Sequence, residues 1–147
     1  MNPGCFLPGT RITMVDKSTK PIEAIAVGDR VLAYDEASGI MSPSEVVALH
    51  APVLSESHLV INGFLRVTAV HPFLTKGRWL QAGRLKVGDT LTMADGSQTR
   101  ITEIRREAVE TMVYNFSVAM GTFVAEGVIV HNKDLPYEQQ PCQDCEE

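Results

Sequence analysis

The sequence predicts an all-β fold in a single domain, on the basis of three observations. Apolar and polar residues alternate with a period of two along most of the chain, which is typical of strands with one buried face. Turn-forming pairs that contain Gly, Pro, Asn or Asp recur at short intervals, and helical periodicity is scarce. The length of 147 residues suits one hydrophobic core, so a second catalytic domain does not fit.

In chain order, the alternating runs are expected to form short strands. These runs are Arg11–Val15, Arg30–Tyr34, Val46–Leu49, Leu59–Ile61, Phe64–Val67, Thr90–Met93, Ile101–Ile104 and Met112–Val118. Asn62-Gly63 predicts a two-residue hairpin turn between two of them, because both residues tolerate a positive φ. The apolar run Val128–Val130 predicts the last strand, and Pro21–Ile25 and Leu80–Leu85 predict brief helical turns.

One segment of the sequence is repeated. Ile25–Leu32 (Ile-Ala-Val-Gly-Asp-Arg-Val-Leu) matches Leu85–Thr92 (Leu-Lys-Val-Gly-Asp-Thr-Leu-Thr). Two copies are too few for a solenoid, so the repeat predicts two duplicated halves related by pseudo-twofold symmetry. Coincidence is the alternative, because Val-Gly-Asp is a common way to enter a strand.

Charge and apolar run length narrow the class of partner. A formal net charge of −5 does not favour nucleic acid or an anionic membrane surface. The apolar runs are strand-length, so no segment is expected to span a bilayer. The first residues lack a basic stretch followed by an apolar one, so no signal peptide is expected, and we predict a cytoplasmic monomer.

The cysteines form an odd and uneven set, so no disulfide framework is expected in the core. Cys5 stands near the start, whereas Cys142 and Cys145 lie in residues 133–147, a polar, acidic segment that is expected to be a flexible tail. The tail pair lacks the two further ligands that tetrahedral zinc needs, so neither a metal nor another cofactor is expected.

Candidate chemical groups stand at the two ends of the predicted core. Cys5 precedes the first strand, and His131-Asn132 follow the last one, so pairing of these strands would bring the groups into one site. His71 is a third candidate, because it stands where an apolar strand meets a proline. The alternatives are a small buried cysteine, a core histidine with satisfied hydrogen bonds, and an asparagine in a turn.

Four motifs in this order resemble those of inteins and related Hint domains. Cys5–Ile12 (Cys-Phe-Leu-Pro-Gly-Thr-Arg-Ile) is similar to their opening motif, and Thr68–His71 (Thr-Ala-Val-His) to their internal Thr-x-x-His motif. Val113–Val118 and Val128–Asn132 resemble their two C-terminal motifs. The resemblance implies the Hint fold, a compact horseshoe-like β-fold with duplicated halves.

The resemblance also implies how the chain is divided and what it acts on. Residues 5–132 would be an autoprocessing domain, with residues 1–4 and 133–147 as its flanking segments. Such a domain acts once on its own flanking segments and is not a multiple-turnover enzyme. The length of the chain leaves no room for the homing endonuclease that many inteins carry.

At the first junction, the resemblance implies an N–S acyl shift. The Cys5 sulfur attacks the carbonyl of Gly4 and converts the amide into a thioester. His71 would protonate the leaving amide nitrogen, since histidine titrates near neutrality, and Thr68 would steady the site by hydrogen bonding. An ordinary cysteine has a pKa of about 8.5, so its thiol needs a neighbouring base to react at neutral pH.

At the second junction, the resemblance implies cyclisation of Asn132. Its side-chain nitrogen attacks its own backbone carbonyl, which forms a succinimide and breaks the bond to Lys133. His131 would donate a proton or a hydrogen bond, because a peptide nitrogen is a poor leaving group.

Three positions depart from the intein pattern. Lys133 stands where standard inteins have Cys, Ser or Thr to accept the acyl group, so cleavage is expected to outweigh splicing, as in bacterial intein-like domains. Asn115 stands where many inteins have an Asp, and an amide is neither a general acid nor a general base. Gly121 stands near the place of a further His, so cleavage at the second junction would depend more on His131.

Rival interpretations remain open at this point. A hedgehog-type Hint domain would pass the thioester to a small nucleophile, and an inert β-module would only bind a partner or present its tail. A thiol of Cys142 or Cys145 could also take the thioester in place of the missing nucleophile. His50 and His58 have no matching partner in the sequence and are expected at the surface.

Overall fold

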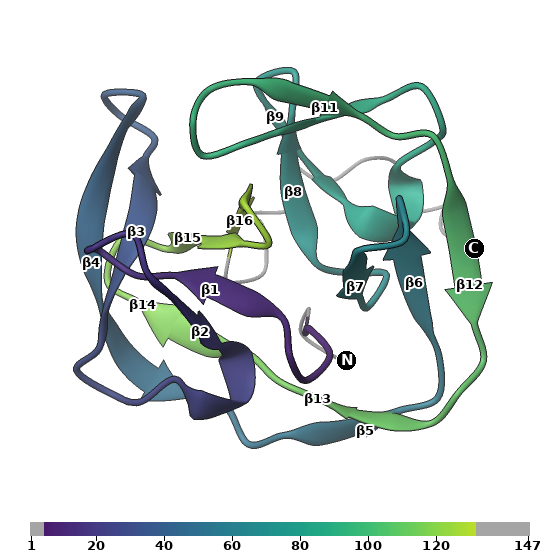
Figure 1. Cartoon of the computed structure of the whole chain (residues 1–147), viewed down its shortest axis with the longest axis horizontal. Coiled ribbons are helices and arrows are strands. Elements are labelled where there is room, and N and C mark those ends of the chain that lie inside the picture. The colour runs from purple at the N-terminus through teal and green to yellow at the C-terminus, as the bar shows by residue number, and fades with distance from the viewer. Residues whose placement is uncertain (1–4, 132–147) are drawn as a thin grey trace.

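The computed structural model describes residues 5–131, and this part of the chain is built from strands and two short 3₁₀ turns. Figure 1 shows the strands arranged as two lobes joined through the six-stranded sheet that contains β1, β15 and β16. The elements are β1 (Arg11–Thr13), β2 (Thr19–Pro21), η1 (Ile22–Ala24), β3 (Arg30–Asp35), β4 (Ile40–Leu49), β5 (Val53–Ser55), β6 (His58–Ile61), β7 (Leu65–Val67), β8 (Pro72–Thr75), β9 (Arg78–Gln81), η2 (Ala82–Arg84), β10 (Thr90–Thr92), β11 (Gln98–Arg100), β12 (Ile104–Glu107), β13 (Thr111–Val113), β14 (Phe116–Val118), β15 (Thr122–Ala125) and β16 (Val128–His131). The prediction of an all-β fold is confirmed.

The largest sheet contains both the first and the last strand of the described residues. Its strand order is β2-β1-β15-β16-β8-β9, and all its pairings are antiparallel. Ile12 of β1 pairs with Ala125 of β15, and Val130 of β16 pairs with Phe73 of β8. The first and last strands are therefore separated in this sheet by β15 alone.

The sequence repeat is also a structural repeat. The N–H groups of Gly28 and Gly88 donate to the carbonyls of Val46 and Ile101 at 2.9 and 2.8 Å, respectively. Both glycines have a left-handed φ, +94° and +102°, which an L-residue adopts only with strain. In each copy, the aspartate that follows accepts a hydrogen bond from the residue three positions before it, at 2.9 Å.

The core is centred on aromatic side chains from strands far apart in sequence. Phe6, Phe73, Phe116 and Phe123 are almost fully buried, and Phe116 and Phe123 stack with ring centroids 4.4 Å apart. Each buried phenylalanine contributes about 1.5–3 kcal/mol to folding through removal of apolar surface from water. This packing fixes the position of Phe6, and through it that of Cys5.

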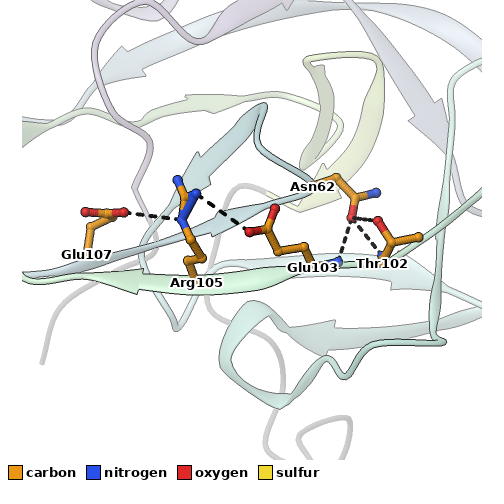
Figure 2. Close-up of polar contacts among 5 residues, drawn as sticks. All are labelled: Asn62, Thr102, Glu103, Arg105 and Glu107. Carbon is orange, nitrogen blue, oxygen red and sulfur yellow. Dashed lines mark hydrogen bonds and ion pairs between the residues drawn. The ribbon is translucent and has the colours of Figure 1, made fainter.

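The predicted turns are confirmed, and one predicted strand is wrong. Asn62 and Gly63 have φ of +53° and +75°, as expected for the hairpin between β6 and β7. Of Ile101–Ile104, only Ile104 is in a strand, because backbone N–H groups of this segment form hydrogen bonds with the Asn62 side chain. Its Oδ1 accepts hydrogen bonds from the N–H groups of Thr102 and Glu103 at 2.8 and 3.2 Å (Figure 2).

Two other predicted strands have different bounds. The run Val46–Leu49 is the end of β4, which begins at Ile40 and pairs along β3 through Pro43. The run Met112–Val118 is split into β13 and β14, with Tyr114 and Asn115 between them. Tyr114 instead forms a two-hydrogen-bond bridge with Phe6, which draws the chain towards Cys5.

Within the described residues, no helix is long and apolar enough to cross a membrane. The two 3₁₀ turns lie within the segments that the sequence predicted as helical.

Candidate functional site

The backbone of Cys5 is held on both sides by other parts of the chain. The Thr68 N–H donates to the Cys5 carbonyl at 2.9 Å. The next residue, Phe6, exchanges two hydrogen bonds with Tyr114, each at 2.8 Å. Cys5 is therefore fixed between the end of β7 and the link between β13 and β14.

The Thr68 hydroxyl contacts the same residue. Its Oγ1 accepts a hydrogen bond from the Cys5 N–H at 2.9 Å and lies 3.3 Å from the Cys5 carbonyl oxygen, to which it can donate. The Cys5 amide nitrogen is the atom that an N–S acyl shift would release. Thr68 thus touches the bond at which the sequence predicted it to act.

The His71 ring packs against Phe6, the residue that follows Cys5, and lies among aromatic side chains. Its ring centroid is 4.3 Å from that of Phe6, 5.8 Å from that of Phe73 and 6.3 Å from that of Phe123. The residue is fully buried, and its backbone N–H donates to the Thr68 carbonyl at 3.3 Å. Thr68 and His71 therefore form one short turn that packs against Cys5-Phe6.

The surroundings of the thiol are apolar. Cys5 is 4% exposed and packs with Leu7, Val113 and Val53. Burial raises the pKa of the Cys5 thiol to about 11, because a thiolate loses its hydration there. The resting thiol is therefore protonated at neutral pH, and attack requires a group that takes its proton as the sulfur approaches the carbonyl.

The turn that carries His71 has a counterpart in the other half of the fold. The His71 N–H donates a hydrogen bond to the carbonyl of Thr68, three residues earlier, at 3.3 Å. The Thr10 N–H donates to the carbonyl of Leu7 in the same way, also at 3.3 Å. The carbonyls of His71 and Thr10 in turn accept from the first residues of η2 and η1, both at 2.8 Å. The two halves thus share this turn, and the imidazole is present in one half where a threonine hydroxyl stands in the other.

Asn115 follows Tyr114, the residue that forms the bridge with Phe6. It is buried, and its Oδ1 accepts a hydrogen bond from the Phe116 N–H at 2.8 Å. Its backbone carbonyl accepts from the His50 N–H at 3.2 Å. The amide side chain therefore stabilises the start of β14, one residue from the Tyr114–Phe6 bridge.

His131 stands at the end of β16, and its side chain is 14% exposed. Its Nε2 lies 3.5 Å from Oε2 of Glu36, and its ring meets that of Trp79 edge-on, with centroids 4.9 Å apart and planes at 86°. In the strand register, His131 pairs with Thr122 of β15. The sequence did not predict Glu36 or Trp79 here, since neither belongs to a motif.

Several sequence-predicted site residues lie outside the described residues. These are Gly4, Asn132 and Lys133 at the two junctions, and Cys142 and Cys145 in the acidic tail. Within residues 5–131, the structure brings together Cys5, Thr68 and His71, with Asn115 nearby.

The prediction of a surface position for His58 is wrong. His58 is 6% exposed on β6, and burial lowers the pKa of its imidazole, against the raising effect of Glu107. Both faces of this short strand are covered, which a run of four residues does not reveal. His50 is half-buried, and its Nε2 lies 2.8 Å from the Ser117 Oγ.

Within residues 5–131, no three His, Cys, Asp or Glu side chains lie close enough together to hold a metal ion.

Comparisons with known proteins place this architecture in the class of Hint domains, which includes inteins. The family model of the pretoxin HINT domain matches residues 12–133, and the chain belongs to that family. The bacterial intein-like domain from Clostridium thermocellum is 31% identical and superposes with a TM-score of 0.78, covering 87% of this chain and 98% of that one.

Two further matches are more distant. The DnaB intein from Synechocystis sp. shares the fold, with 20% identity, a TM-score of 0.72, and coverage of 88% of this chain and 99% of that one. The Tiggy-winkle hedgehog protein of Danio rerio is 26% identical over 145 residues, which are 90% of this chain. The chain spans about a third of that protein's length (34%).

Proposed function

We propose that this chain is a self-processing domain that acts once on its own flanking segments. In the first step, the Cys5 sulfur attacks the Gly4 carbonyl carbon, and the bond from that carbon to the Cys5 nitrogen breaks. The thiol proton is transferred by way of His71 to the released nitrogen, which becomes the free amine of Cys5. The product is a thioester between Gly4 and the Cys5 side chain.

One observation carries this proposal: the Thr68 hydroxyl lies 2.9 Å from the nitrogen of the bond that would break. An amine can accept a hydrogen bond, which an amide nitrogen does not, and its protonated form donates more strongly than an amide N–H, so this contact favours the product of the shift. The same turn places the His71 ring against that of Phe6, the residue that follows Cys5. An inert β-module would not require either contact.

In the second step, Asn132 cyclises. Its side-chain nitrogen forms a bond to its own carbonyl carbon, and the bond to the Lys133 nitrogen breaks. One proton leaves the side-chain amide and one reaches the Lys133 nitrogen, so the residues after Asn132 depart with a new amino terminus. Because Lys133 offers neither a thiol nor a hydroxyl, the two flanking segments are released and not joined.

Intact mass spectrometry of the 147-residue chain tests both steps. A thiol reductant is expected to release residues 1–4 by attack on the thioester, and incubation is expected to release residues 133–147. Cys5→Ala should abolish the first release and leave the second, whereas Asn132→Ala should do the reverse. A parent chain that keeps its full mass under all conditions would identify an inert β-module.

A second candidate function is transfer of the thioester to a small nucleophile, and the similarity to a hedgehog protein favours it. It shares the Cys5 step and differs in what attacks the thioester. Mass spectrometry after incubation with small amines, thiols and alcohols distinguishes it, because the acceptor would remain attached to Gly4.

A further inference from the structure

The contacts of His131 within the described chain identify a residue that no motif contains. The imidazole of His131 contacts both the carboxylate of Glu36, at 3.5 Å, and the Trp79 ring, whose plane is nearly perpendicular to it. We propose that Glu36 is a positioning residue for cleavage after Asn132, which orients His131 and favours its protonated form. This inference rests on the proposed function, since it concerns the group that assists the second step.

Glu36 is held in place by the fold. It follows β3 directly, in the tight turn before β4, where the Gly39 N–H donates to the Asp35 carbonyl at 2.7 Å. Two residues earlier, Tyr34 exchanges hydrogen bonds with the Thr122 hydroxyl, at 2.8 and 2.7 Å. Thr122 is the register partner of His131, so one short series of contacts connects the end of β3, which Glu36 follows, with His131.

Other titratable groups on the neighbouring elements have different roles. The Asp35 carboxylate accepts the Ala37 N–H at 3.0 Å, and the Tyr34 side chain packs on the apolar cluster that contains Trp79. Arg78 is next to Trp79 on β9, and its side chain is exposed. β8 and β15 contribute no charged residue to this region. Within residues 5–131, Glu36 is thus an acidic group that contacts the imidazole directly.

The contact between Glu36 and His131 favours one protonation state of the imidazole. Because the carboxylate faces Nε2, it favours the form in which that nitrogen carries a proton. In its imidazolium form, His131 supplies a proton to the Lys133 nitrogen as the bond breaks, and it regains one from the Asn132 side-chain amide.

The test replaces the charge and keeps the shape. In Glu36→Gln, the rate of release before Lys133, measured on the full chain by mass spectrometry, should fall by about 2- to 5-fold at pH values where the imidazole is largely neutral. The rates of parent and variant should converge at lower pH, where both are protonated. Glu103→Gln is the matched control, because Glu103 is also exposed and ion-paired, with Arg105 at 3.7 Å (Figure 2).

An NMR titration separates this inference from the function on which it rests. In an Asn132→Ala background the chain stays intact, and Glu36→Gln should move the His131 titration midpoint down by about 0.3–0.7 pH unit, while Glu103→Gln should not. Equal midpoints and superimposable rate profiles would overturn the role of Glu36. A parent chain that never releases residues 133–147 would overturn the second step, whereas the titration would still decide whether Glu36 controls His131.

Discussion

The Thr68 hydroxyl offers a direct test of the first step. Thr68→Val removes the hydroxyl and keeps the shape, so the Cys5 N–H loses its acceptor at 2.9 Å and the Cys5 carbonyl loses a contact at 3.3 Å. A hydrogen bond to a neutral group contributes about 0.5–1.5 kcal/mol, and one to a charged group about 1.5–3 kcal/mol. The Cys5 nitrogen gains charge as it leaves, so its hydrogen bond to Thr68 is stronger in the transition state than in the resting chain by about 1–2 kcal/mol. Thr68→Val removes this extra stabilisation of the transition state.

This loss corresponds to a rate of thiol-dependent release of residues 1–4 that is about 5- to 30-fold lower than in the parent. The assay is a time course of intact mass at fixed pH and fixed reductant concentration. Thr68→Ser is the control, because it keeps Oγ and should stay within about 3-fold of the parent. If Thr68→Val releases the segment as fast as the parent and is equally stable to heat, the hydroxyl has no part in the reaction.

Three further predictions concern the thiol, the repeat and the tail. Because burial raises the pKa of Cys5 to about 11, alkylation of its thiol below pH 9 should be about 100-fold slower in the folded chain than in the denatured chain. For the same reason, the free energy of unfolding should fall as pH rises from about 9 to 11. Equal alkylation rates of the folded and denatured chains, measured by mass spectrometry, would contradict this. Gly88→Ala forces an L-residue to φ +102° and should lower the free energy of unfolding by about 1–3 kcal/mol in a denaturant titration. A Cβ at this position meets no atom within 4 Å, so the loss would come from backbone strain and not from a steric clash. Unchanged stability would exclude that strain. Replacing Cys142 and Cys145 by Ser should leave the release of residues 1–4 unchanged; a slower release would show that a tail thiol takes the thioester.

Much of the fold follows from local sequence signals. Asn62-Gly63 has the positive φ values that its hairpin turn requires, and the Val-Gly-Asp segments enter β3 and β10 with matching hydrogen bonds. These features depend on a few neighbouring residues, so a single sequence is enough to predict them.

The errors come from contacts between distant segments. Ile101–Ile104 alternates like a strand, but its backbone groups bond to Asp89, Gly88 and the Asn62 side chain. His58 is buried because both faces of β6 are covered, which depends on the packing of whole strands. Tertiary contacts of this kind override local propensity.

The candidate site shows the same division. Cys5, Thr68 and His71 are candidates from their motifs, and the structure places the Thr68 hydroxyl on the Cys5 N–H and the His71 ring on Phe6. Glu36 and Trp79 could not be predicted, because they reach His131 from a turn after β3 and from β9, far away in the chain.

Trapping with hydroxylamine tests the account most directly, because it attacks a thioester and leaves amide bonds intact. Treating the freshly folded chain at neutral pH should yield residues 1–4 with a hydroxamate on Gly4, and a partner fragment that begins at Cys5. Neither fragment should form from Cys5→Ala. A parent chain that yields no Gly4 hydroxamate, while remaining folded, would contradict the central claim that the Cys5 sulfur takes up the preceding carbonyl.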